Sequence, residues 1–227
     1  MFGFGKKSLP DFAEAYLAKT SSKRPAKAIP LEQLRFAVID TETTGFEIGR
    51  DRLLSIGLVI VAEDRIEVEQ SGGWLIQQSD VPLNDAVRIH GIMPDESAEG
   101  EPEAEVLKDL LPRIADTIFV AHHTGFDLGM INSALFRHYA LKLRNPWLDT
   151  AEMAIKTLDA FARTNYVAQR PPGLDEVCQQ CDIRPMARHT ATGDAFTTAE
   201  VLLSLCARLR RHLGRPLTAG DLPIHRG

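Results

Sequence analysis

The segment from Phe36 to Gly45, with the sequence FAVIDTETTG, constrains the fold and chemistry of this 227-residue chain more than any other segment. Its run of apolar residues predicts a buried strand, and Thr-Thr-Gly predicts a tight turn at the end of that strand. Side chains two positions apart lie on one face of a strand, so Asp40 and Glu42 point the same way, less than about 7 Å apart. Two interpretations follow: a pair of solvated acids at a strand end, or a site for a cation between two carboxylates.

Two further acids follow histidines at the predicted starts of helices. The sequence HHTGFD ends at Asp127, where a strand over 117–121 passes into a helix, and HTATGD runs from His189 to Asp194 before the last predicted helix. Each aspartate alone would be interpreted as an acid favoured by the dipole of its helix. In the second segment, the intervening loop could fold the His189 imidazole back over Asp194.

Taken together, these side chains have the composition that a two-metal centre needs. Hard divalent ions prefer carboxylate oxygens, and two Mg²⁺ ions about 4 Å apart can hold the attacking and leaving oxygens of a phosphoryl displacement. A histidine, whose ordinary pKa is about 6.5, can take the proton from the attacking water. The candidate set is Asp40, Glu42, Asp127, Asp194 and His189.

The composition is that of an ordinary globular protein, with 44% hydrophobic and 25% charged residues. The longest apolar run, 53–62, is too short to span a bilayer, and no apolar stretch follows Lys6 and Lys7 as a secretory signal requires. We therefore expect no membrane association. Three cysteines, an odd number, favour a reducing compartment, so we expect the cytoplasm.

The remaining patterns predict an α/β fold, a sheet covered by helices. Beyond the strands already named, we expect one over 53–62 and a third over 66–76 that Gly72 and Gly73 interrupt. Helices are predicted over 82–89, 102–111, 126–143, 149–163, 174–181 and 194–213.

Five segments, in order, resemble motifs of the DEDDh family of 3′–5′ exonucleases, and most closely those of the proofreading epsilon subunits of bacterial DNA polymerase III. The resemblance extends over about residues 35–213, and its motifs are 38–45, 88–92, 121–127, 148–150 and 189–195. It implies a ribonuclease H-like mixed sheet flanked by helices. It also implies an enzyme that uses Mg²⁺ or Mn²⁺, two ions per site, to hydrolyse phosphodiester bonds at single-stranded or frayed 3′ ends of DNA, releasing nucleoside 5′-monophosphates.

The resemblance assigns roles to the candidate residues. Asp40, Glu42 and Asp194 would ligate the first metal, with Asp40 also reaching the second. Asp127 would hold a water of the metal, and His189 would be the general base. The substrate-binding residues would be Thr43, Phe46, Asp85 and His90.

Among these substrate contacts, Phe46 would wedge against the terminal base, and Asp85 and His90 would contact the 3′-terminal nucleotide. The alternative for His90 is a histidine that only stabilises a turn. The chain departs from the family pattern at His123, where the family usually has Asn, and at Ser55, where a Glu is common.

The sequence divides into a basic N-terminal arm, residues 1–30, and an exonuclease domain, residues 31–227. Residues 1–35 carry a net charge of +4, whereas the whole chain carries −5. We expect a short helix from Ser8 to Lys19 and a linker from Thr20 to Pro30. The arm is either a solvated tail or a docking helix, or its cations contact substrate phosphates. Those cations are Lys19, Lys23, Arg24 and Lys27.

Other functions stay open. An exoribonuclease resembling ribonuclease T or oligoribonuclease would differ in how it meets the 2′-OH, which one sequence does not reveal. A non-catalytic subunit that binds a DNA polymerase is a third possibility, but such a protein has no use for four converging carboxylates. No sliding-clamp motif is visible. Cys178 and Cys181 are interpreted as helix packing, with a zinc site involving Cys206 or redox chemistry as alternatives.

Overall fold

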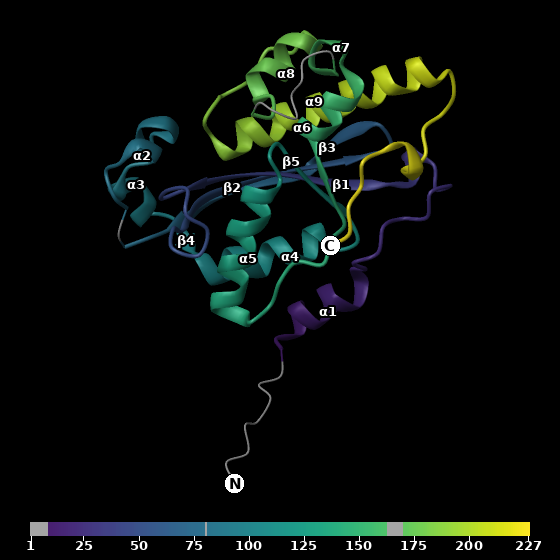
Figure 1. The fold of residues 1–227 in the computed structure, drawn as a ribbon. Helices are drawn as coiled ribbons and strands as arrows, with labels where there is room; N and C mark the ends of the chain where they lie inside the picture. Colours follow the sequence, from purple (N-terminus) through teal and green to yellow (C-terminus); the bar gives the residue numbers. More distant parts are fainter. Residues whose placement is uncertain (1–8, 80, 163–169) are drawn as a thin grey trace.

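A six-stranded sheet in the order β4-β3-β2-β1-β5-β6 organises the part of the chain that this computed structural model describes, residues 9–79, 81–162 and 170–227 (Figure 1). The pairs β1–β2 and β2–β3 are antiparallel, whereas β1–β5, β5–β6 and β3–β4 are parallel. The predicted mixed sheet is confirmed. Its strands are β1 (Arg35–Thr43), β2 (Leu53–Ala62), β3 (Arg65–Gln77), β4 (Glu101–Pro102), β5 (Ile118–Ala121) and β6 (Trp147–Asp149).

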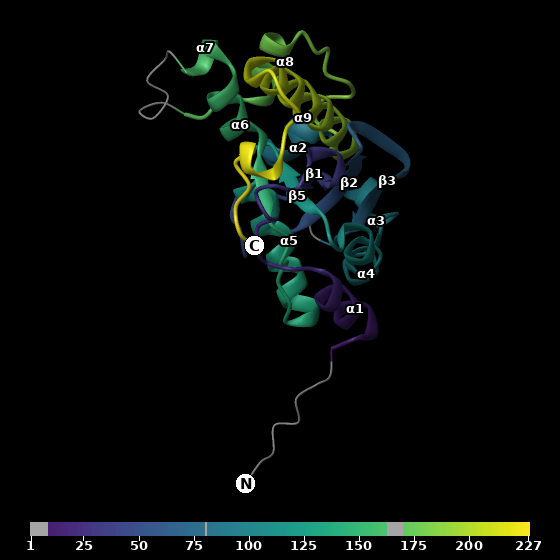
Figure 2. The ribbon, with the colours of Figure 1, turned by 90° about the vertical axis from the view of Figure 1, so that its right-hand side faces the viewer.

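Helices cover both faces of the sheet, with α6, α8 and α9 on one side and α1, α4 and α5 on the other (Figures 1 and 2). The helices are α1 (Asp11–Lys19), α2 (Asp85–His90), α3 (Pro94–Ala98), α4 (Glu103–Ile114), α5 (Gly125–Tyr139), α6 (Thr150–Thr157), α7 (Asp159–Ala162), α8 (Leu174–Cys181) and α9 (Ala191–Leu213). Short 3₁₀ turns lie at Leu31–Gln33 and Ala219–Asp221.

The alternation of side chains along β1 divides the core into two layers. Phe36 and Val38 are buried with the residues of α6, α8 and α9, whereas Ala37 and Ile39 are buried with those of α1, α4 and α5. Because the strand has a period of two, Asp40 continues the series of Phe36 and Val38 toward α9. The β1 sequence therefore determines which helix the first acid faces.

Several predicted element boundaries are wrong. The third strand is continuous, since Gly73 pairs with Gly57 and Gly72 with Leu58 within the β2–β3 ladder. The helix predicted over 126–143 ends at Tyr139, because Ala140 adopts the left-handed conformation with φ of 50°.

The helix predicted over 149–163 is instead the end of strand β6 followed by α6 and α7, and its expected end at Arg163 lies outside the described residues. The last helix begins at Ala191, one turn earlier than the predicted start at Asp194, so Asp194 lies in its first turn.

The N-terminal segment packs on the rest of the molecule. Tyr16 of α1 is fully buried, donates a hydrogen bond to Asn145 Oδ1 (2.6 Å) and accepts one from the Arg144 N–H (2.7 Å). Burial raises the pKa of Tyr16 to about 12. The Leu31 N–H donates to the Leu217 carbonyl (3.0 Å), which ties the segment after α1 to the C-terminal residues.

The docking-helix alternative agrees with this packing of α1. Residues 1–8, with the expected helix start at Ser8 and the cations Lys6 and Lys7, lie outside the described residues. The division of the chain at residue 30 stays a prediction.

The three cysteines are buried and free of disulfides. Cys178 and Cys181 of α8 and Cys206 of α9 belong to one apolar layer, and burial raises the pKa of Cys178 and Cys206 to about 12. Among the described residues, no cysteine belongs to a group placed to hold a metal, which agrees with the packing interpretation. No described helix is both long enough and apolar enough to cross a membrane.

Candidate metal centre

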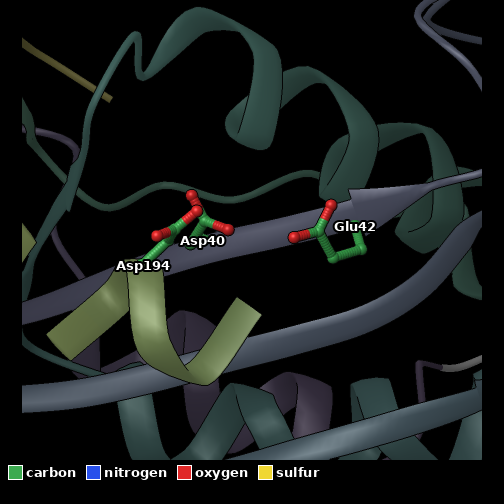
Figure 3. A group of neighbouring side chains, drawn as sticks. All are labelled: Asp40, Glu42 and Asp194. Carbon is green, nitrogen blue, oxygen red and sulfur yellow. The ribbon is translucent and has the colours of Figure 1, made fainter. Parts of the chain in front are cut away.

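Three carboxylates converge at the end of β1. Asp40 and Glu42 come from β1, and Asp194 comes from the first turn of α9 (Figure 3). One ligand oxygen from each residue lies within 4.8 Å of the others, a separation that one divalent ion can bridge. The structure thus brings together the three residues that were predicted to ligate the first metal.

Two glycines let α9 approach the sheet closely enough to deliver Asp194. Asp40 pairs with Gly57 of β2, and Gly57 pairs with Gly73 of β3, so the three lie in one row across the sheet. A Cβ atom at Gly57 would lie 2.1 Å from the Ala191 carbonyl oxygen, and one at Gly73 would lie 2.3 Å from the Thr192 Cγ2. Gly73, which was predicted with Gly72 to interrupt the third strand, is therefore, together with Gly57, part of the surface on which the α9 N-terminus rests.

Asp127, the fourth predicted acid, lies beside this group without belonging to it. It is only 4% exposed in the first turn of α5, and its Oδ1 accepts a hydrogen bond from Thr41 Oγ1 at 2.7 Å. Thr41 points to the α5 side of β1 because it alternates with Asp40. Thr41 had no predicted role, although its position between the candidate ligands Asp40 and Glu42 is a usable sequence signal.

The charges of neighbouring acids add to burial in raising the pKa of Asp40 and Glu42. Burial, and then the charges of Asp127 and Asp194, raise the pKa of Asp40 well above its usual range. Burial, followed by the charges of Asp194 and Asp127, raises the pKa of Glu42 to about 7. Burial also raises the pKa of Asp127 to about 7. A bound cation would relieve this repulsion and favour the ionised forms of all the carboxylates.

The two oxygens of Asp194 have different surroundings. Its Oδ2 pairs with the Arg188 guanidinium and accepts a hydrogen bond from the His189 backbone N–H (3.1 Å). Its Oδ1 is buried and, within the described part of the chain, has no hydrogen-bond partner. A buried carboxylate oxygen without a donor is costly unless a ligand satisfies it. The residues present therefore fit a divalent metal.

Arg188 is a member of this site that the sequence analysis missed. Its guanidinium also binds the Asp175 carboxylate of α8 through two hydrogen bonds, Nε to Oδ1 at 2.7 Å and Nη2 to Oδ2 at 3.2 Å. It thus joins α8 to the start of α9. Nothing in the local sequence distinguishes Arg188 from the exposed Arg184 four residues earlier.

His189 lies on the exposed rim of the site. His189 (φ of 63°) and Ala187 (φ of 43°) both adopt the left-handed conformation in the loop that precedes α9. His189 lines a hollow of about 390 Å³ with His90, Glu96 and Trp74. The predicted base is therefore open to solvent and adjacent to the carboxylates through its backbone hydrogen bond to Asp194.

His90 is held by both of its ring nitrogens. The Ile92 N–H donates to Nδ1 (3.0 Å), so in the neutral ring Nε2 carries the proton and donates to the Thr43 carbonyl (3.2 Å). Burial lowers the pKa of His90, which favours this neutral form. These bonds tie the end of α2 to the end of β1, a structural role that is compatible with the turn alternative.

The other predicted substrate contacts differ in exposure. Phe46 is 65% exposed, and its ring centroid lies 6.3 Å from that of Phe126. Asp85 is exposed and pairs with Arg88 at 2.9 Å. Thr43 is buried and donates to the Gly45 carbonyl at 2.6 Å. Phe46 is thus free to stack on a ligand, whereas Thr43 shapes the turn after β1.

Asp149 organises the loop between β5 and α5. Its carboxylate caps α6 by accepting from the Ala151 N–H (2.8 Å), and it accepts from the N–H groups of His123 (3.2 Å) and Thr124 (3.1 Å). The exposed His123 adopts a φ of 67°. The link to Asp149 uses the His123 backbone, so it is present despite the departure from Asn.

Comparisons with known proteins agree with this geometry. Residues 37–202 match a family model described as Exonuclease. The chain belongs to the exonuclease family. This assignment confirms the resemblance found in the sequence and makes the chain a member of a family of nucleic-acid hydrolases.

Similar proteins include DNA polymerases of the PolC type. The chain is 30% identical over 178 residues to DNA polymerase III PolC-type of Oceanobacillus iheyensis, covering 77% of this chain and 12% of that protein. The match to the Bacillus subtilis counterpart is 28% over 183 residues, again covering 77% and 12%. The chain thus spans only about an eighth of the length of these relatives.

Solved structures share the fold. Escherichia coli exonuclease I, in complex with a dT13 oligonucleotide, has a TM-score of 0.66 and 20% identity, covering 80% of this chain and 43% of that one. Exonuclease I of Methylocaldum szegediense has a TM-score of 0.64 and 19% identity, with coverage of 80% and 41%. The ribonuclease H-like arrangement is therefore the fold of this chain.

Proposed function

We propose that this protein is a 3′–5′ exonuclease that removes nucleoside 5′-monophosphates from single-stranded or frayed 3′ ends of DNA. The observation that supports it best is the buried Asp194 Oδ1, which has no partner among the described residues and belongs to a carboxylate grouped with Asp40 and Glu42. The choice of DNA rests on the names of similar proteins, a DNA polymerase III and an exonuclease I solved with dT13.

In this proposal, Asp40, Glu42 and Asp194 would hold the first of two Mg²⁺ or Mn²⁺ ions, Asp40 would also reach the second, and Asp127 would hold a water of the metal. The ions supply charge neutralisation of the attacking and leaving oxygens. Thr41 orients Asp127 through its hydrogen bond to Oδ1 (2.7 Å). His189 accepts the proton of the attacking water on an imidazole nitrogen.

Substrate contacts are assigned to the rim. The exposed Phe46 ring would stack on the terminal base, a contact that every base can make because each has a π-face. Thr43, Asp85 and His90 would line the place of the 3′-terminal nucleotide, with the His90 ring held in place by its two hydrogen bonds. The cytoplasmic location and an association with a DNA polymerase stay predictions, the latter supported by the polymerase names of the relatives.

The test is an assay on DNA and RNA oligonucleotides of one sequence, labelled at the 3′ or the 5′ end, with Mg²⁺ or Mn²⁺. We expect 3′-labelled DNA to release its label as a mononucleotide at once, and 5′-labelled DNA to shorten stepwise. An Asp194→Asn protein and an EDTA reaction are the controls. Preferred hydrolysis of RNA would favour the exoribonuclease alternative, and no hydrolysis of either would favour a non-catalytic subunit.

A further inference from the structure

A basic cleft lies at the opposite end of the sheet from the carboxylates. A hollow of about 390 Å³ is bounded by residues 20–25 and by the starts of β1 and β5. A second hollow, of about 810 Å³, shares Lys23 and Arg24 with the first and extends it to Arg226. In Figure 1 the chain enters β1 on the right, whereas α2, which is bonded to the end of β1, lies on the left.

Cations without carboxylate partners gather around these two hollows. Lys23, Arg24, Arg35 and Arg226 line them, against the side-chain carboxylate of Asp116 and the main-chain carboxylate of Gly227. Among the described residues, Lys23, Arg24 and Arg226 form no ion pair, and all three are exposed. In a chain of net charge −5, unpaired cations in one place mark a surface suited to a polyanion.

The backbone that carries these cations is fixed. The Gly227 N–H donates to the Ser22 carbonyl (3.2 Å), and the Ala219 N–H donates to the Ile29 carbonyl (2.8 Å). The buried Thr20 accepts from the Asp116 N–H through its hydroxyl (3.3 Å). The segment is therefore held against the domain, and its charges are positioned before a ligand arrives, which lowers the entropy cost of binding.

We propose that this basic cleft binds the phosphate backbone of a single-stranded nucleic acid at a distance from the metal centre. Two adjoining hollows suit an extended chain of phosphates better than a single phosphate group. Arg35 precedes Asp40 by five residues on β1, so the two sites are about 17 Å apart along the strand at about 3.3 Å per residue. The idea that the same strand reaches both sites rests on the proposed exonuclease function.

The test measures binding of a fluorescent single-stranded DNA of about sixteen nucleotides, within the range of known site sizes, in EDTA, where hydrolysis is stopped. The double variant Lys23→Gln, Arg24→Gln removes two unpaired cations. We expect its log–log salt dependence to be shallower than the wild-type one by about 1.4, which corresponds to two phosphate contacts on a single strand. The matched control, Lys108→Gln, Arg113→Gln, removes two exposed, ion-paired cations of α4.

Hydrolysis of a dinucleotide, which is too short to span both sites, should be unchanged in the double variant, whereas the Michaelis constant for the longer strand should rise. Equal salt slopes for wild type and double variant, or an equal change in the α4 control, would overturn the proposal. Because the binding assay needs no hydrolysis, a protein that binds through the cleft but cleaves nothing would refute the exonuclease function alone.

Discussion

Buried acids lie at two places in the described part of the chain, and the two places differ in how the negative charge is compensated. Glu103, at the start of α4, is 8% exposed. Its carboxylate accepts two hydrogen bonds from Arg137 Nη2 (3.0 Å each), pairs with His138 Nε2 (2.7 Å) and accepts a longer hydrogen bond from Gln78 Nε2 (3.4 Å). Protein groups alone satisfy this acid.

The acids at the end of β1 lack such partners. Asp40, Glu42 and Asp194 share the nearby cation Arg188, which also binds Asp175. Taking a carboxylate out of water costs several kcal/mol unless partners compensate it. The burial of an acid alone therefore does not reveal its function. A compensated buried acid stabilises the fold, and an uncompensated group indicates a cation supplied from solution.

The largest expected effect is on turnover, at the uncompensated site. Asp40→Asn keeps the side-chain shape but removes the charge shared by both proposed metal sites, so hydrolysis of single-stranded DNA in saturating Mg²⁺ should fall by about 10³-fold or more. Circular dichroism should show an intact fold. Glu103→Gln is the matched control, since it neutralises a compensated acid. Turnover of Asp40→Asn near the wild-type value would remove the basis for the metal centre.

The second prediction concerns the proposed base. His189→Ala should lower the catalytic rate by about 10²–10⁴-fold, the usual contribution of a positioned general base, with little change in the affinity for Mn²⁺. The wild-type rate should show the pH dependence of general-base catalysis, and the variant should lack it. If Mn²⁺ affinity falls as strongly as the rate, His189 is a metal ligand.

The third prediction tests the compensated site. Glu103→Ala leaves Arg137 and His138 without their carboxylate and should lower the free energy of unfolding by about 3 kcal/mol, as for other broken buried pairs. Turnover per folded molecule should stay near that of the wild type. Urea unfolding in EDTA measures the loss. Under the same conditions Asp194→Asn should lower the free energy of unfolding by less than Glu103→Ala does. An equal loss in the two variants would contradict the distinction between the compensated and uncompensated acids.

The smallest expected effect is the pH dependence of the metal-free protein. Burial raises the pKa of both Glu42 and Asp127 to about 7, so the folded protein retains protons that the unfolded chain has already released. In EDTA, the free energy of unfolding should therefore fall by about 1 kcal/mol between pH 6.5 and pH 8, and Mg²⁺ should restore it at pH 8.

The pH interval is chosen to avoid an opposing titration. Burial lowers the pKa of His122 to about 4, so its contribution to stability increases as pH rises toward the ordinary histidine value and is constant above about pH 6.5. Asp40→Asn serves as a control, since it removes one source of repulsion. A stability that increases from pH 6.5 to pH 8 in EDTA would contradict the assignment of raised pKa values.

The sequence predicted what depends on local periodicity. Alternation along β1 placed Asp40 and Glu42 on one face, and the histidine-containing segments placed Asp127 and Asp194 in the first turns of helices. The α/β class follows from the same patterns. These features need no knowledge of distant contacts.

Features that depend on contacts between distant segments were not predictable. Gly73 looks like a strand breaker until α9 is placed above it, because the reason for the glycine lies in residues far along the chain. Arg188 has no local signal that distinguishes a surface cation from the partner of Asp194. The strand β6 is three residues long, too short to show alternation, and it forms by pairing with β5.

Because α9 approaches Gly57 and Gly73 so closely, the catalytic site depends on the position of this helix as well as on the identity of its acids. One methyl group at Gly57 would lie 2.1 Å from the Ala191 carbonyl oxygen, so the helix would have to lift by more than about 1 Å to reach ordinary contact. A misplacement of about 1 Å can cost 10²-fold in rate. A change of one carbon atom on β2, in a residue that is not a metal ligand, would thus disable the enzyme with every ligand still in the sequence. The presence of the acids alone is therefore a poor guide to which relatives are active.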